Sequence, residues 1–153
     1  MQKKINIQNK KARFEFEILD KYIAGIQLTG TEIKSIRNSQ ARITESFCEF
    51  NEHGELFIIN MYIQEYLFGH HFNHNPKSER RLLLNKRELR SLKKDVEAKG
   101  NTIVPLRLFI NERGFAKLEI ALAKGKQTHD KRNVIKDRDN KRDLARIKKS
   151  FNA

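Results

Sequence analysis

Apolar and polar residues alternate with a period of two over several short stretches of the chain, which is typical of β-strands. The first stretch places Phe14, Phe16 and Ile18 on one face and charged residues on the other. Residues 46–50 and 56–63 are separated by a short segment with glycine, which is typical of a hairpin. Residues 102–110 and 115–123 are separated in the same way. The pattern predicts about six strands, over residues 13–18, 26–28, 46–50, 56–63, 102–110 and 115–123.

Two segments have the period of a helix instead. Residues 29–38 begin with threonines and a glutamate, which favour a helix start, and carry Ile33 and Ile36 three positions apart. In residues 85–100, Asn85 and Glu88 have the spacing of a capping box, and Gly100 favours a stop. The outer surface of this second helix is expected to be basic.

Short strands without βαβ spacing favour an antiparallel sheet that closes on itself. We therefore expect a mainly β fold, an OB-like barrel of about six strands with peripheral helices. The barrel is expected to occupy residues 1–123, and a basic tail to occupy residues 124–153.

The net charge of the chain indicates the class of partner that it binds. The 153 residues carry a formal net charge of +13, which favours a polyanion. No apolar run approaches the ~18–20 residues that span a bilayer, so we expect no membrane association. Cys48 is the single cysteine and is expected to be buried, which fits a cytoplasmic protein without disulfides.

The tail contains eleven Lys or Arg and four Asp but few large apolar residues. Such a segment cannot offset an ordering cost of roughly 1–2 kcal/mol per residue, so we expect disorder in the free protein. Arg138, Arg142, Arg146 and Lys149 recur at helical spacing, which predicts a basic helix that forms on a polyanion. A solvated, solubilising tail is the alternative interpretation.

The segment 124–132 connects the last predicted strand to this tail. Gly125 allows a close approach of the backbone to a phosphate, and Lys124 and Lys126 supply charge on either side. The same glycine also suits the end of a strand. His129 is able to stack on a base; alternatively, Asp130 before Lys131 and Arg132 makes a local cap and ion pair.

A histidine cluster is the one feature that suggests metal chemistry. His70, His71 and His74 lie close together, but neighbouring Asn and Pro residues indicate a loop, and no cysteine or second carboxylate completes a metal site. No phosphate-binding glycine loop or nucleophile elbow is present in the sequence. We expect no metal, no cofactor and no catalytic residue.

Glu32 lies in the first turn of the first predicted helix, where a carboxylate stabilises the helix dipole. The same carboxylate is able to accept hydrogen bonds from base amino groups, which would give RNA specificity. From spacing alone, capping is the favoured role.

Several separated motifs occur together in one order along the whole chain: "NKKARFEFEI", "AGIQLTGTEIKSIR", "GHHFNHNPKSERRLLLNKREL" and "ALAKGKQTHDKR". On these motifs the chain resembles the SsrA-binding protein family, also called small protein B. The resemblance implies an OB-like barrel that binds the tRNA-like domain of transfer-messenger RNA (tmRNA) and supports its aminoacylation. It further implies delivery of that RNA to stalled ribosomes for trans-translation, without bond chemistry by the protein itself.

The resemblance also implies site residues and partners. The tail would become helical in the empty message channel near the decoding centre, and alanyl-tRNA synthetase and elongation factor Tu would be partners through the RNA. For Glu32 it favours an RNA contact over capping. The implied RNA contacts are Asn9, Lys10, Lys11, Arg13, Glu32, Lys34, Arg37, Lys124, Gly125 and Lys126. The implied ribosome contacts are His129, Asp130, Lys131, Arg132, Lys136, Arg138, Arg142, Arg146 and Lys149.

Two other functions remain open on the sequence alone. One is a general ribosomal RNA-binding protein or RNA chaperone without a dedicated RNA partner. The other is a metal-dependent nuclease that uses His70 or His74.

Overall fold

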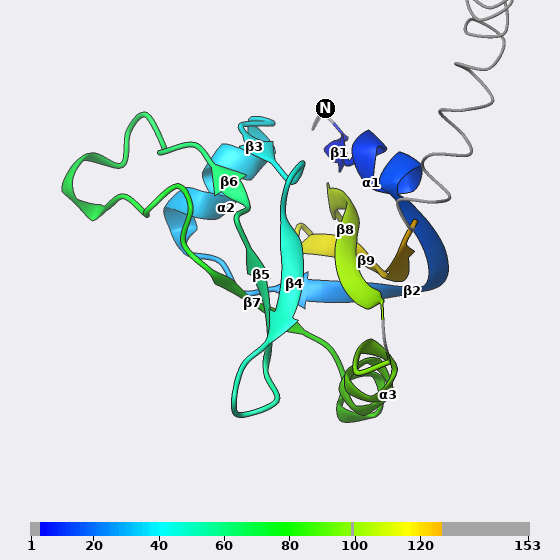
Figure 1. Ribbon diagram of the computed structural model, residues 1–153. Coiled ribbons are helices and arrows are strands. Elements are labelled where there is room, and N and C mark those ends of the chain that lie inside the picture. Colours follow the sequence, from blue (N-terminus) through cyan, green and yellow to red (C-terminus); the bar gives the residue numbers. More distant parts are fainter. Residues whose placement is uncertain (1–3, 99, 127–153) are drawn as a thin grey trace, which may run out of the picture.

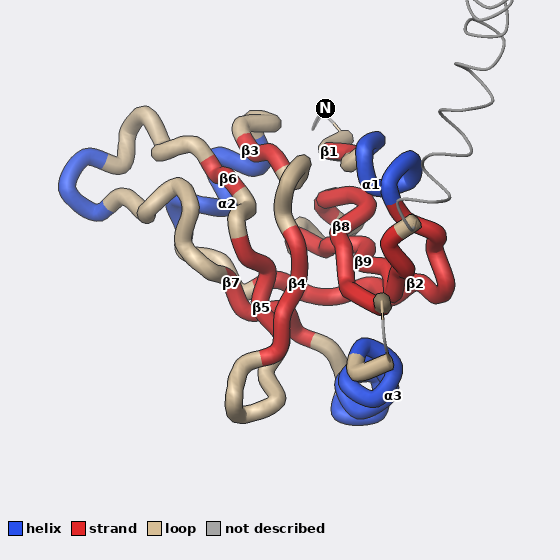
Figure 2. Tube along the Cα trace, viewed as in Figure 1, coloured by secondary structure: helices blue, strands red, loops and turns tan. Residues whose placement is uncertain are grey.

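Antiparallel strands form a closed ring in the computed structural model, which describes residues 4–98 and 100–126 (Figure 1). The ring order is β8-β4-β5-β7-β2-β9, and pairing of β9 with β8 closes it. The mainly β fold class is therefore confirmed (Figure 2). The ring strands are β2 (Phe16–Ile26), β4 (Phe47–Phe50), β5 (Leu56–Ile59), β7 (Arg80–Leu83), β8 (Asn101–Ile110) and β9 (Ala116–Gly125).

Both predicted hairpins are confirmed. β4 pairs with β5 from Phe47 opposite Ile59 to Phe50 opposite Leu56. β8 pairs with β9 along almost their full lengths. Each connecting turn contains a glycine with positive φ, Gly54 at 78° and Gly114 at 85°, a conformation that glycine adopts without strain.

Three strand predictions need correction. Residues 26–28 are not a separate strand, because Ile26 is the last residue of β2 and the strand ends before Gln27. The ring strand β7 was not predicted. The predicted run 56–63 is two strands, because Asn60 has a φ of 65° and turns the chain after β5. The second part, β6 (Tyr62–Ile63), pairs with β3 (Ala41–Arg42) in a separate small sheet. A further short strand, β1 (Asn6–Gln8), adds to β8 outside the ring.

The predicted strand at residues 13–18 is wrong in its first half. Residues Lys10–Glu15 form a short helix, α1, and β2 begins only at Phe16. The Asn9 side chain accepts from the backbone N–H of Ala12, 3.2 Å away, and so caps the helix. Alternation of apolar and charged residues also fits one and a half turns of helix, which is why the pattern misled.

Both predicted helices are confirmed. α2 (Gly30–Arg37) has a capping box between Thr29 and Glu32, and α3 (Lys86–Val96) has one between Asn85 and Glu88. α3 ends at Val96, before the predicted stop at Gly100, where φ is +85°. A single 3₁₀ turn, His70–Phe72, lies in the predicted histidine loop.

Inward-facing side chains of the ring form the core together with residues from α2 and α3. Ile36 of α2 and Leu92 of α3 are both fully shielded from solvent. Cys48 is also buried within this core, as predicted. Among the described residues, no helix has the length and apolar character needed to cross a membrane.

Candidate nucleic-acid interface

The chain segments before β2 and after β9 meet on one side of the ring. Phe16 lies opposite Gly125 in the sheet, and the backbone N–H of Lys126 donates to the carbonyl of Glu15 over 3.1 Å. The Lys126 ammonium lies 5.9 Å from the centroid of the Phe14 ring. Two motifs that are far apart in the sequence therefore form one surface, which we call the exit surface: α1 with residues 124–126.

A small basic hollow of about 210 Å³ lies beside α1, between this helix and β8. Three cations border it: Lys10 and Arg13 come from α1, and Arg107 comes from β8. Arg107 also pairs with Glu119 at 3.3 Å, which holds its guanidinium in place over the sheet. Concentrated positive charge around a concave site is an arrangement that binds phosphate.

The structure separates the four N-terminal candidates into different environments. Lys10 and Arg13 are exposed at the hollow. Lys11 instead pairs with Glu45 and, at 3.7 Å, with Glu15. Its hydrogen bond to Glu45 is the main cause of its raised pKa.

Asn9 is buried and acts within the protein. Besides capping α1, its side-chain amide donates to the carbonyl of Pro105 over 3.0 Å. Its own backbone N–H donates to the carbonyl of Leu106 over 2.8 Å. Asn9 therefore fixes α1 against β8 and positions the cations of the hollow.

The strand-exit motif is part of β9. Lys124 is exposed and lies opposite Glu17, and Gly125 is the last residue of the strand. A Cβ atom at Gly125 would have only one neighbour within 4 Å, a Phe16 ring carbon at 4.0 Å, and its φ is not in the positive range. No feature of the described residues requires glycine here, so the predicted close approach of a phosphate stays a prediction.

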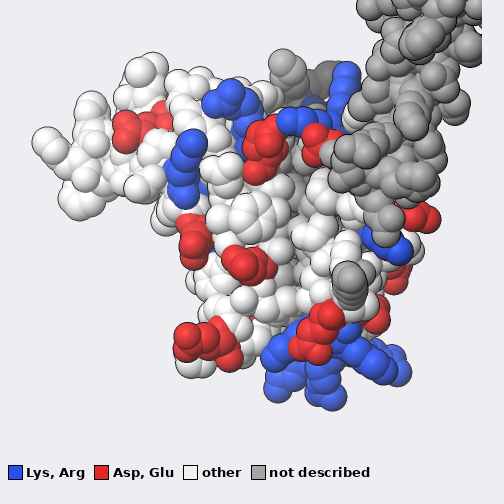
Figure 3. Space-filling view, in the orientation of Figure 1, with Lys and Arg blue, Asp and Glu red and all other residues white. Residues whose placement is uncertain are grey.

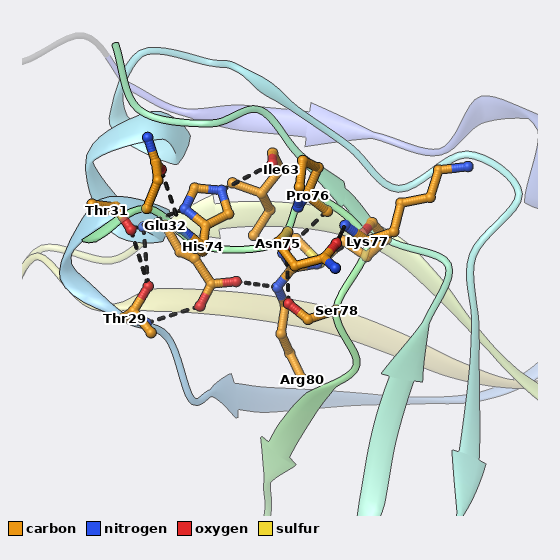
Figure 4. Close-up of polar contacts among 12 residues, drawn as sticks. Thr29, Thr31, Glu32, Ile63, His74, Asn75, Pro76, Lys77, Ser78 and Arg80 are labelled. Carbon is orange, nitrogen blue, oxygen red and sulfur yellow. Dashed lines mark hydrogen bonds and ion pairs between the residues drawn. The ribbon is translucent and has the colours of Figure 1, made fainter. Parts of the chain in front are cut away.

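The structure confirms that Glu32 caps α2, the role that its spacing in the sequence favoured. One carboxylate oxygen accepts from the backbone N–H of Thr29 over 2.9 Å, and the other accepts from Arg80 (Figure 4). Glu32 is only 4% exposed. An RNA contact through this carboxylate would require one of the two bonds to open.

Arg80, the buried ion-pair partner of Glu32, was not predicted from the sequence. It is 3% exposed, and its guanidinium also donates to backbone carbonyls of Met61, Asn75 and Pro76 at 2.8–3.1 Å. The sequence carries no clear signal for its burial, because Arg80 and Arg81 precede three leucines without alternation; only the structure shows that Arg80 and Leu82 face inward. An arginine on such a face requires a buried partner.

The other α2 candidates lie away from the exit surface, since α2 and α1 are on different sides of the ring (Figure 1). Lys34 is exposed and lies over the Tyr66 ring, 5.4 Å from its centroid. Arg37 is exposed beside the turn between β8 and β9. The structure thus does not bring all the predicted RNA contacts together.

The predicted histidine loop contains one buried member. His74 places Nε2 2.9 Å from the carbonyl of Ile63 and Nδ1 2.9 Å from the hydroxyl of Thr31. Because a carbonyl only accepts, Nε2 carries a hydrogen and donates. Both ring nitrogens are engaged within the protein, which disfavours His74 as a metal ligand or general base. Within residues 4–98 and 100–126, no group of three potential metal ligands occurs.

A second concentration of basic residues lies on α3. Lys and Arg cluster over this helix at the lower end of the face drawn in Figure 3. The exposed cations are Lys86, Arg87, Arg90, Lys93 and Lys94. This confirms the basic outer surface predicted for the helix.

The tail candidates His129, Asp130, Lys131, Arg132, Lys136, Arg138, Arg142, Arg146 and Lys149 lie outside the described residues. Their role on the ribosome remains a prediction from the sequence.

Comparisons with known proteins agree on one family. The SmpB protein family model matches residues 6–150. The SsrA-binding protein of Flavobacterium psychrophilum is 69% identical over 151 residues, which is 99% of this chain and 100% of that protein. The SsrA-binding protein of Brucella anthropi is 54% identical over 145 residues, covering 95% of this chain and 91% of the relative.

The fold is also similar to that of solved structures, one of which is informative here. That structure is described as "tmRNA-SmpB: a journey to the center of the bacterial ribosome". It superposes with a TM-score of 0.69 at 45% identity and covers 85% of this chain and 94% of the solved one. The family model, the relatives and this structure lead to one conclusion: the chain belongs to the SmpB family.

Proposed function

We propose that this protein binds tmRNA and takes part in trans-translation as a non-enzymatic adaptor. Its relatives are named SsrA-binding proteins, and its structural neighbour is described as tmRNA-SmpB in the bacterial ribosome. The observation that carries the proposal is the exit surface, where Lys126 contacts α1, the helix whose Lys10 and Arg13 line the hollow together with Arg107. Phosphate contacts of this kind orient a structured RNA on a protein.

In this proposal the exit surface holds the tRNA-like domain. Lys10, Arg13 and Arg107 neutralise phosphates around the hollow, and Lys124 and Lys126 do so along the end of β9. Asn9 positions these groups without contacting RNA. Glu32 shapes the neighbouring end of α2 through Thr29 and Arg80 and contacts RNA only if that pairing changes on binding.

The exit surface is tested with paired substitutions in the full chain. We expect Arg13→Gln with Lys126→Gln to weaken binding of the tRNA-like domain roughly tenfold or more and to lower the salt slope by roughly 2. The matched control is Lys93→Gln with Lys94→Gln on α3, which removes the same charge elsewhere. An equal loss in the control would overturn the assignment of the exit surface.

The competing idea of a general RNA chaperone is separated by a different comparison. A dedicated partner predicts that the tRNA-like domain binds more tightly than unrelated hairpins of equal length at one salt concentration. Equal affinities would favour the chaperone. Metal-dependent RNA cleavage that disappears in His70→Ala would instead favour the nuclease.

We further propose that the protein supports aminoacylation of the RNA and its delivery to stalled ribosomes. Alanyl-tRNA synthetase and elongation factor Tu would then act on the same RNA while it is held at the exit surface. The rate of alanine charging of tmRNA with and without the protein tests the first step. An unchanged rate would contradict it.

We propose that the tail acts on the ribosome, with residues 129–132 near the decoding centre. The predicted basic helix of Arg138, Arg142, Arg146 and Lys149 would lie in the message channel. A truncation after Lys126 keeps all of β9 and the bond from Lys126 to Glu15. We expect the truncated protein to keep its RNA affinity and to lose peptide tagging. Tagging at the full rate would overturn the role of the tail.

A further inference from the structure

The chain between β6 and β7 forms an arm, residues 64–79, that projects from the ring at the left of Figure 1. Large apolar side chains gather at its tip, where Leu67 is 80%, Phe68 is 67% and Phe72 is 90% exposed. The arm is drawn almost entirely in white in Figure 3, since it carries few charges. Clustered apolar exposure of this kind marks an interaction surface.

The arm is held in a defined shape. The Asn73 side chain accepts from the backbone N–H of Tyr66 over 3.0 Å and donates to its carbonyl over 2.7 Å. The rings of Tyr66 and Phe68 pack edge to face with centroids 5.7 Å apart. His74 fastens the arm to α2 through Thr31. Its aromatic groups are therefore positioned before any partner binds.

A hollow of about 500 Å³ lies along the arm, and its lining extends from Tyr62 in β6 to Leu67 and His70. Three flat rings, those of Tyr62, Tyr66 and His70, contribute to its lining. Gln64 and Glu65 add an amide and a carboxylate beside them. This volume falls within the range of small-molecule sites, and the mixture of flat rings with hydrogen-bonding groups suits a nucleobase.

Two cations outside the lining lie against two of these rings. The Lys34 ammonium lies 5.4 Å from the Tyr66 ring centroid, and the Arg42 guanidinium lies 4.8 Å from that of Tyr62. They come from α2 and β3, so positive charge lies next to the rings of the hollow. Aromatic rings that stack on bases, next to cations that neutralise phosphates, form the usual platform for single-stranded nucleic acid.

We propose that the arm and its hollow bind unpaired nucleotides of RNA. Duplex RNA is a poor ligand for this surface, because its bases are stacked inside the helix and cannot reach Tyr62 or Tyr66. A purely apolar partner would leave Gln64, Glu65 and the two cations without partners. The inference rests on the proposed RNA-binding function and adds a second surface, separate from the exit surface.

The test measures binding of a single-stranded RNA heptamer, and separately of the tRNA-like domain, to the full chain. We expect Tyr66→Ala to weaken heptamer binding about tenfold or more, the size that stacking on one base provides. Tyr66→Phe keeps the ring and should stay within about threefold of the unsubstituted protein. Unfolding midpoints show whether each variant is folded.

A second pair of variants compares an aromatic residue of the arm with one elsewhere on the surface. Phe68 at the tip and Phe115 in the turn between β8 and β9 are similarly exposed, at 67% and 63%. We expect Phe68→Ala to weaken heptamer binding and Phe115→Ala to leave it unchanged. Unchanged binding in both Phe68→Ala and Tyr66→Ala would overturn the inference.

The two proposals fail differently. If the tRNA-like domain binds and is released by substitutions at the exit surface, but the heptamer is insensitive to the arm, only the inference is wrong. If neither RNA binds, the proposed function is wrong as well. Binding of the arm to lipid vesicles or to a protein, with no binding of the heptamer, would also overturn the inference about the arm.

Discussion

Glu32 and Arg80 form an ion pair inside the protein, with side-chain exposures of 5% and 2%. The same carboxylate accepts from the backbone N–H of Thr29, and the same guanidinium donates to three backbone carbonyls (Figure 4). The pair therefore joins the start of α2 to β7 and to the base of the arm. Because both charges are withdrawn from water, each depends on the other for its stability.

The first prediction concerns loss of this pair. Arg80→Gln leaves the Glu32 carboxylate buried without a positive partner, so the free energy of unfolding should fall by about 3–5 kcal/mol. Urea denaturation followed by circular dichroism measures this loss.

The adjacent residue provides a matched control. Arg81 pairs with Glu55 at 2.9 Å, but this pair is exposed, with side chains 45% and 30% accessible. Because water screens such a pair, Arg81→Gln should cost at most about 1 kcal/mol. Similar losses for the two arginines would show that burial of the Glu32 pair has no special consequence.

The second prediction concerns Asn9. Asn9→Ala removes both the cap on α1 and the bond to Pro105, and we expect a loss of about 1–3 kcal/mol in unfolding free energy. Asn9→Asp keeps an acceptor for the Ala12 N–H but places a buried carboxylate against the Pro105 carbonyl, so it should lose at least as much. Urea denaturation of both variants measures these losses. Full stability of Asn9→Ala would contradict the structural role of this side chain.

Local patterns predicted much of the fold. Both hairpins, both long helices and their capping boxes follow from residues close in the sequence, where alternation, turn glycines and cap spacing act directly. The helix α1 was missed because its alternation fits a strand equally well over so few residues. Asn60 was missed because a positive φ at asparagine leaves no mark in the apolar pattern.

The candidate site depended on contacts that no local pattern records. The sequence indicated Lys126 and Arg13 as separate motifs, and it is the pairing of β2 with β9 that places residues 124–126 beside α1. Arg107 lines the same hollow as Arg13 because it lies on β8, the strand next to α1. The burial of Glu32 likewise depends on Arg80, a distant residue whose inward position no alternation in the sequence indicates.

The third prediction separates folding from binding at Gly125. Its backbone does not need glycine, and an added Cβ would meet only the Phe16 ring at 4.0 Å, so Gly125→Ala should change the unfolding free energy by less than about 0.5 kcal/mol. If a phosphate approaches the backbone there, RNA affinity should nevertheless fall.

Gly114→Ala serves as the opposite case. Its φ of +85° is strained for alanine, so this variant should lose about 1 kcal/mol or more of stability. Equal RNA affinity of Gly125→Ala and the unsubstituted protein would remove the close-approach explanation for glycine at this position.

The fourth prediction concerns Cys48 and alkaline pH. Burial raises the pKa of the Cys48 thiol above its ordinary value of 9.0, so the folded protein keeps the proton where the unfolded chain releases it. Above about pH 9 the unfolded state therefore binds fewer protons, and the stability of the folded state falls as the pH rises.

Cys48→Ala isolates this contribution, because it removes the thiol and leaves every other titrating group in place. The variant is expected to be less stable at pH 7, since it leaves a small cavity in the core. Between pH 9 and 10.5 the unsubstituted protein should lose up to about 1.4 kcal/mol per pH unit more than the variant does, as expected for one proton. Urea denaturation at several pH values measures both slopes. Parallel slopes would mean that the thiol ionises as readily in the folded protein as in the unfolded chain, and that the core around β4 admits solvent.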